Sequence, residues 1–127
     1  MTTFDPDRVS RAIGAALSGP GGVGLVLKVF CGVPGVILVP ARRSFFRSQP
    51  ERVQIGEWRY EVTADGRVSA AHLVNGIVLA DEVLAAGAVG PHLARALGQL
   101  VRNYGPTIMP NLDAALEVLE TGSEPRF

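Results

Sequence analysis

The clearest pattern in the chain is an alternation of apolar and polar residues across residues 57–81. From Trp58 to Val62 the apolar side chains recur at every second position, which is the period of a half-buried β-strand. Two dipeptides, Asp-Gly ending at Gly66 and Asn-Gly ending at Gly76, interrupt the alternation. Both tolerate the positive φ angles of two-residue hairpin turns, so the region predicts a three-stranded antiparallel meander.

A two-residue turn at Gly66 would set the register of the first two strands. It pairs Arg59 with His72 and Glu61 with Ala70, so Arg59, Glu61 and His72 are expected on one face of the sheet. A carboxylate beside an imidazole and a guanidinium can form a general acid/base site. The other interpretation is a solvated cross-strand charge cluster. It is favoured because the sequence places no nucleophile or second carboxylate beside these residues.

The amino-terminal residues carry the signals of a helix start. Asp5 can accept the free amide hydrogens of a first turn, and Pro6 supplies a preset φ at the first helical position. Apolar residues then recur at helical spacing along one face, and the glycine-rich residues 18–22 end the helix. This apolar stripe consists of Val9, Ala12, Ile13, Ala16 and Leu17.

Two more helices are expected near the carboxyl terminus. One begins near Pro91 and ends at Tyr104, before Gly105 and Pro106, and the other spans residues 111–120 with Asn111 as its cap. The first has an inward stripe of Leu93, Ala96, Leu97, Leu100, Val101 and Tyr104 and an outward face of His92, Arg95, Gln99 and Arg102. We therefore expect His92 to be solvated, the alternative being an anion contact in the first turn. Residues 123–127 are expected to form a loose tail.

Residues 23–31 and 36–41 are two apolar, β-branched runs that predict a second hairpin. Pro34 and Gly35 between them suit the central positions of a type II turn. Because both faces of these runs are apolar, we expect them to lie centrally in the sheet. Residues 23–39 are also a candidate membrane span, but Lys28 and several Gly and Pro residues interrupt them. A buried hairpin is the better interpretation, and no membrane partner is expected.

Between the predicted hairpins, residues 42–55 mix basic and aromatic side chains. Arg42, Arg43 and Arg47, beside Phe45 and Phe46, could hold a phosphate or a single-stranded base. The alternative is a solvated loop whose two rings close the edge of the core. The 12 basic residues balance 12 acidic residues to a net charge of zero, which makes a nucleic-acid partner unlikely and favours the solvated loop.

Length and composition predict a single cytoplasmic domain. The chain has 127 residues, enough for one core, and its lone cysteine, Cys31, excludes a disulfide framework. No paired cysteines, phosphate-binding loop or zinc motif occur, so no cofactor or metal is predicted. Of the 12 basic residues only Lys28 is lysine, which is typical of a GC-rich genome, and we predict an actinobacterial source.

The predicted order is helix, hairpin, loop, meander, helix, helix. It gives a single α+β domain over residues 1–127, with a five-stranded, mostly antiparallel sheet packed against an N-terminal helix and two C-terminal helices. This order is similar to the small folds of secretion-chaperone-like and roadblock-like dimers. The chain also resembles small actinobacterial proteins that are grouped in families of unknown function. Neither resemblance rests on a residue motif, so neither implies a site.

The first functional hypothesis is a non-enzymatic, self-associating adaptor or chaperone-like protein, with a homo-oligomer or a protein partner. It rests on a high apolar content of 47% and on strands that exceed what a few helices can cover. The alternative is a small apolar-ligand-binding protein with a pocket between sheet and helix, lined by Trp58, Tyr60 and Leu97. A third is a weak anion or nucleic-acid contact through Arg42, Arg43 and Arg47.

Overall fold

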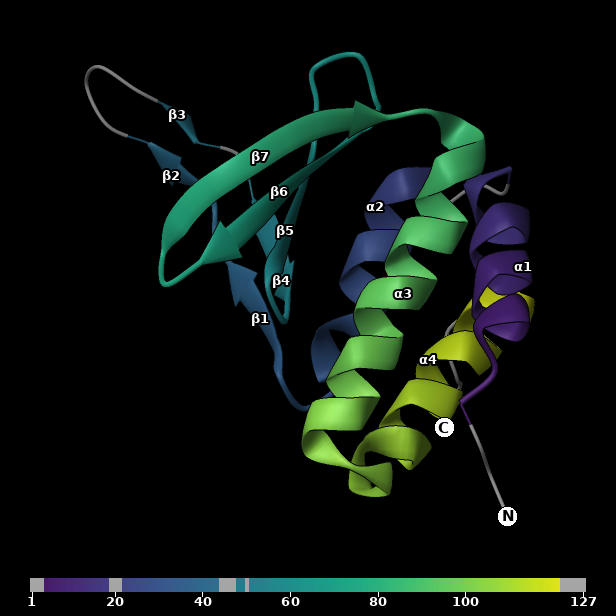
Figure 1. Ribbon diagram of the computed structural model, residues 1–127. Helices are drawn as coiled ribbons and strands as arrows, with labels where there is room; N and C mark the ends of the chain where they lie inside the picture. Colours follow the sequence, from purple (N-terminus) through teal and green to yellow (C-terminus); the bar gives the residue numbers. More distant parts are fainter. Residues whose placement is uncertain (1–3, 19–21, 44–47, 50, 122–127) are drawn as a thin grey trace.

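The computed structural model describes residues 4–18, 22–43, 48–49 and 51–121. These residues form a sheet of five antiparallel strands and four α-helices (Figure 1), which confirms the α+β class. The helices are α1 (Pro6–Leu17), α2 (Gly22–Val29), α3 (Ala86–Tyr104) and α4 (Met109–Thr121), with the 3₁₀ turns η1 (Phe30–Gly32) and η2 (Pro106–Ile108). The strands are β1 (Val36–Val39), β2 (Arg42–Arg43), β3 (Ser48–Gln49), β4 (Arg52–Ile55), β5 (Trp58–Val62), β6 (Val68–Val74) and β7 (Ile77–Leu84).

The main sheet has the strand order β1-β4-β5-β6-β7, and each neighbouring pair is antiparallel. β2 and β3 form a separate two-stranded ladder between β1 and β4. The predicted meander is therefore confirmed as β5, β6 and β7. The two edges of the main sheet are β1 and β7, so the expectation that residues 36–41 lie centrally in the sheet is wrong.

Residues 23–31 were expected to be a strand, and this prediction is wrong: they form most of α2 and the start of η1. An apolar run that is buried on several sides has the same hydrophobic pattern in a helix as in a strand, so periodicity does not distinguish them. Val26, Leu27 and Phe30 all point into the core, and this packing outweighs the β propensity of the valines. The turn at Gly35 does form, with φ +92°, but it joins η1 to β1.

β4 is the strand that pairs with β1, where residues 23–31 were expected to pair. It lies in the stretch expected to be irregular, and it pairs with β1 on one side and β5 on the other. Val53 and Ile55 face the core while Arg52 and Gln54 alternate with them. The alternation is only four residues long and follows a run of arginines, so its signal is weak.

The expected pairing of β5 with β6 is off by one residue. Trp58 lies opposite His72 and Tyr60 opposite Ala70, because the connection at residues 63–67 is longer than a two-residue turn. Inside it, the backbone N–H of Gly66 donates to the carbonyl of Thr63 at 3.0 Å. Shifting a strand by one residue exchanges its faces, so His72 joins the face of Trp58.

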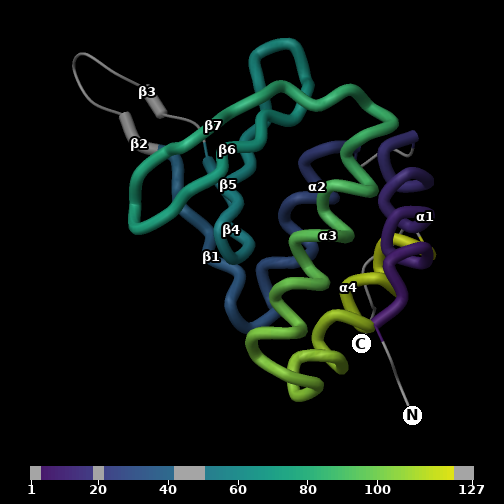
Figure 2. The backbone as a smooth tube through the Cα atoms, viewed as in Figure 1, coloured from purple at the N-terminus to yellow at the C-terminus, as the bar shows by residue number. Residues whose placement is uncertain are grey.

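The core lies between the sheet and two layers of helices. α2 and α3 pack on one face of the sheet, and α1 and α4 pack on the side of these helices that faces away from it (Figure 2). The largest completely buried side chains are Tyr60, Phe30, Ile13, Ile55, Leu93 and Leu97. Within the described part of the chain, no helix is long and apolar enough to cross a membrane.

The helix ends follow local chemistry closely. The Asp5 carboxylate accepts hydrogen bonds from the backbone N–H groups of Asp7 and Arg8, which confirms the predicted cap of α1. α3 begins at Ala86, earlier than expected, so Pro91 lies inside it. α4 also begins early, so Asn111 is a helix residue that donates to the Gly32 carbonyl rather than a cap.

The β6–β7 turn provides a test of the fold. Asn75 and Gly76 both have positive φ, 53° and 79°, a conformation that β-branched residues resist. We predict that Gly76→Val lowers the free energy of unfolding by more than about 1 kcal/mol, measured by urea denaturation. The matched control is Gly14→Ala in α1, where an added Cβ meets open space. It should raise the free energy of unfolding by about 0.5–1 kcal/mol. Equal effects of the two substitutions would contradict the turn assignment.

Candidate functional site

A cluster of rings joins the sheet to α3. The imidazole of His72 stacks on Trp58 from the neighbouring strand, with 4.6 Å between ring centroids and 17° between planes. Glu57 Oε2 lies 3.1 Å from His72 Nε2 in an exposed pair. The predicted grouping of Arg59, Glu61 and His72 is therefore wrong, because Arg59 and Glu61 alternate with Trp58 and lie on the other face.

His92 completes the cluster from α3. Its ring packs edge-on against Trp58 and Tyr60, and the Tyr60 hydroxyl and His92 Nδ1 are hydrogen-bonded at 2.8 Å. The residue is only 6% exposed, so the expectation of a solvated histidine is wrong. The physical reason is that α3 is covered on more than one side, which leaves a broader inward face than its apolar stripe indicates.

Burial fixes the charge state of the Tyr60–His92 pair. It raises the pKa of the Tyr60 phenol well above its ordinary value and lowers the pKa of the His92 imidazole, which the neighbouring Arg95 cation lowers further. Glu82 opposes the shift of His92. At neutral pH both groups are uncharged, and each satisfies the other in the core. The pair is arranged to hold α3 on the sheet.

The three residues predicted to line an apolar pocket differ in how far they are buried. Tyr60 and Leu97 are completely buried in the core, whereas Trp58 is partly exposed. Trp58 lines a cavity of about 260 Å³ together with Glu82, His92, Arg95 and Gln99. Most of these side chains are polar, so the cavity has a different character from the apolar pocket expected there. Ligand binding by Trp58, Tyr60 and Leu97 stays a prediction.

Anion binding by Arg42, Arg43 and Arg47 stays a prediction. Arg42 and Arg43 form β2, opposite Gln49 and Ser48 of β3. Their side chains and the whole of Arg47 lie outside the described residues. In the part of the chain that is described, no three His, Cys, Asp or Glu side chains are grouped closely enough to hold a metal ion.

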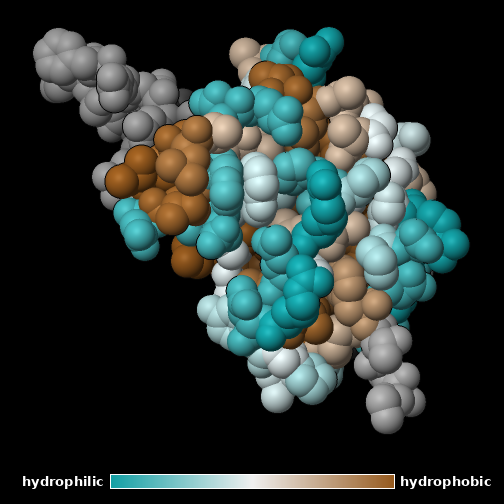
Figure 3. Space-filling view, viewed as in Figure 1, coloured by the Kyte–Doolittle hydropathy of each residue, from teal (hydrophilic) through white to brown (hydrophobic). Residues whose placement is uncertain are grey.

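The most unusual surface is the edge strand β7. Ile77, Val78 and Leu79 are 64%, 45% and 62% exposed, and Val83 further along is also exposed. A hydrophobic patch covers the end of this strand next to the β6–β7 turn (Figure 3). Among the described strands β7 pairs with β6 alone, so its outer backbone groups face solvent. The apolar run 77–80 is visible in the sequence, but its exposure follows from the position of β7 at the sheet edge, which depends on long-range pairing.

The chain matches a described family, Domain of unknown function (DUF5073), over residues 1–121. The chain belongs to the DUF5073 family. The DUF5073 match spans every element from α1 to α4 and confirms the expected resemblance to a family of unknown function. No curated protein and no solved structure matches the chain.

The Tyr60–His92 pair predicts a pH dependence. The folded pKa of His92 lies below its ordinary value of 6.5, so the unfolded chain takes up a proton first as the pH falls. We predict that the free energy of unfolding decreases as the pH falls through about 6.5 and continues to decrease until the folded pKa is reached. His92→Gln should flatten this part of a stability profile measured by denaturation between neutral and mildly acidic pH. An unchanged slope in the variant would show that His92 is not buried as a neutral group.

Proposed function

We propose that this protein is a non-enzymatic, self-associating adaptor or chaperone-like protein that associates through β7. The observation that carries the proposal is the exposed apolar segment Ile77–Leu79 on a sheet edge. We call these three residues the β7 apolar segment. An unpaired strand edge with exposed apolar side chains is a template for another strand, and stable monomers usually protect such edges.

The charged residues of β7 limit which part of this edge can pair with another strand. Asp81 and Glu82 follow the β7 apolar segment and are both exposed. Charged side chains on an edge strand discourage pairing and protect the second half of β7, whereas the first half carries no charge and has only the register shift at Leu79. The association surface is therefore the half of β7 next to the β6–β7 turn.

The occupant that fits this half best is a second copy of the chain. An antiparallel β7–β7 pair centred on Leu79 places Asp81 opposite Ile77 of the partner. The two Asp81 carboxylates are then about 13 Å apart, four residues along a strand, which exceeds the screening length of about 8 Å in physiological salt. A pair centred on the carboxylates would bring them into contact. The two-fold arrangement also closes the assembly at two copies.

The size of the surface indicates a reversible dimer. Full burial of an aliphatic side chain contributes about 1.5–3 kcal/mol, and the dimer would bury three partly exposed side chains from each copy against an association cost of about 4–15 kcal/mol. Added strand hydrogen bonds shift the balance only modestly. A dimer of this kind can open and offer the same edge to an extended apolar segment of another protein, which is how an adaptor or chaperone would use it.

One other observation bears on the proposed location. A half-buried, single Cys31 agrees with a reducing cytoplasm. The similarity to secretion-chaperone-like and roadblock-like dimers rests on the predicted element order, in which residues of α2 were taken for a strand, and it stays a proposal.

Substitution at the edge tests the dimer. We predict that the wild-type chain sediments as a concentration-dependent dimer and that Leu79→Lys is monomeric at every concentration from micromolar upward. Ile37→Lys is the matched control, because Ile37 is 54% exposed on the opposite edge strand. It should dimerise like the wild type. A monomeric wild type, or dissociation by Ile37→Lys alone, would contradict the assignment of β7.

Cysteine cross-linking tests the register. In a Cys31→Ser background, Leu79→Cys should form a disulfide-linked dimer, because a residue at the centre of a two-fold antiparallel pair lies opposite its own copy. Val83→Cys should remain uncross-linked under the same oxidation, since it lies further along the strand. Cross-linking of Val83→Cys alone would move the centre of the pair into the charged half of β7.

A further inference from the structure

A second, more apolar cavity lies at the other end of β7. Its volume is about 420 Å³, within the range of small-molecule sites, and it lies where α1 ends and α3 begins. The apolar walls come from five elements that are distant in sequence, and only the fold brings them together. They are formed by Leu17, Val23, Val68, Leu84 and Val89.

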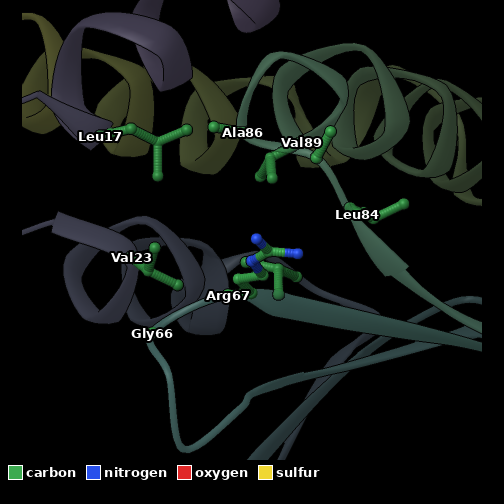
Figure 4. A pocket seen from close by; sticks show the side chains of 9 residues that line it. Leu17, Val23, Gly66, Arg67, Leu84, Ala86 and Val89 are labelled. Carbon is green, nitrogen blue, oxygen red and sulfur yellow. The ribbon is translucent and has the colours of Figure 1, made fainter.

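One cationic side chain reaches into this space. Arg67 extends between the end of α1, the start of α2 and the first turn of α3 (Figure 4). Its Nε lies 3.5 Å from Asp65 Oδ2, and both side chains are largely exposed, so this ion pair is weak. Asp65 also accepts a hydrogen bond from the Thr63 hydroxyl within its own turn. A guanidinium has five N–H donors, and the Asp65 contact involves Nε alone.

The start of α3 adds positive potential to the same rim. Ala85 and Ala86 line the cavity, and within the described residues no side chain caps the amino end of this 19-residue helix. The first turn consists of Ala, Gly and Val, so no carboxylate offsets the helix dipole there. The free amide groups of a helix amino end favour anions. The cavity therefore combines apolar walls with a positive rim.

We infer that this cavity binds a small amphipathic carboxylate. The apolar tail lies among Leu17, Val68 and Val89, and the carboxylate lies at the rim, where Arg67 and the amino end of α3 meet it. Charge complementarity selects an anion over a neutral or cationic ligand of the same shape. The site is separate from the β7 apolar segment, because it lies at Leu84 and the association surface begins at Ile77.

Titration calorimetry with octanoate tests the inference. Octanoate should bind saturably to the wild-type chain, while octanamide, which has the same tail without the charge, should bind at least about tenfold more weakly. Acetate, which lacks the tail, should show no saturable binding. Saturable binding of octanoate by the wild type is required, and its absence overturns the inference. Equal affinities for octanoate and octanamide would overturn the carboxylate assignment.

Variants locate the site. Arg67→Gln should lower the octanoate affinity towards that of octanamide, with the amino end of α3 retaining part of the preference for the charge. Ala86→Phe should abolish binding of both by filling the rim from an exposed position. The control is Arg11→Gln, because Arg11 is an exposed arginine on α1 away from the cavity. This variant should bind octanoate as the wild type does. Binding that survives Ala86→Phe places the ligand elsewhere and overturns the site.

A last experiment distinguishes failure of the ligand site from failure of the proposed dimer. Leu79→Lys, the variant designed to be monomeric, should bind octanoate with unchanged affinity, because the cavity is built within one chain. Chemical-shift changes at the amides of Gly66 and Ala86 should accompany binding in both backgrounds. Loss of binding in Leu79→Lys would show that the site needs a second copy and would overturn the single-chain cavity.

Discussion

The fold depends on α3 being buried on two sides. Towards α1 it approaches so closely that a Cβ on Gly90 would lie 2.9 Å from the Ser10 carbonyl oxygen. Towards the sheet it is fixed by the hydrogen bond between His92 and Tyr60. Because interiors are close-packed, neither contact can loosen without moving the helix as a whole. The covered face of the sheet, the ring cluster and the amphipathic cavity all take their positions from this one element.

Local chemistry predicted the parts of the fold that a few neighbouring residues determine. The Asp5 cap, the positive-φ turn at Gly76 and the end of α3 at Gly105 follow from capping and turn rules alone. The assignment of residues 23–31 failed because burial from several sides removes the periodicity that separates a helix from a strand. The burial of His92 also escaped prediction, since its partner Tyr60 is distant in sequence and only the folded chain supplies it.

The two candidate surfaces were likewise predicted only in part from the sequence. An excess of apolar strand residues was visible in the sequence, and it accounts for the exposed segment at Ile77–Leu79. Which strand would lie at the edge was not visible, because strand order depends on long-range pairing. The amphipathic cavity could not be anticipated either. Its cation, Arg67, and its helix amino end at Ala86 belong to different elements, and their meeting is a property of the topology.

The connection at residues 63–67 bears on how β6 keeps its inward face. Val62 lies opposite Val68, so the residues between them lie outside the β5–β6 ladder. The burial of Val68 and Ala70 fixes which face of β6 points into the core, and a loop can absorb an added residue while the ladder keeps its register. A change of length at this turn therefore leaves the core face of β6 unaltered.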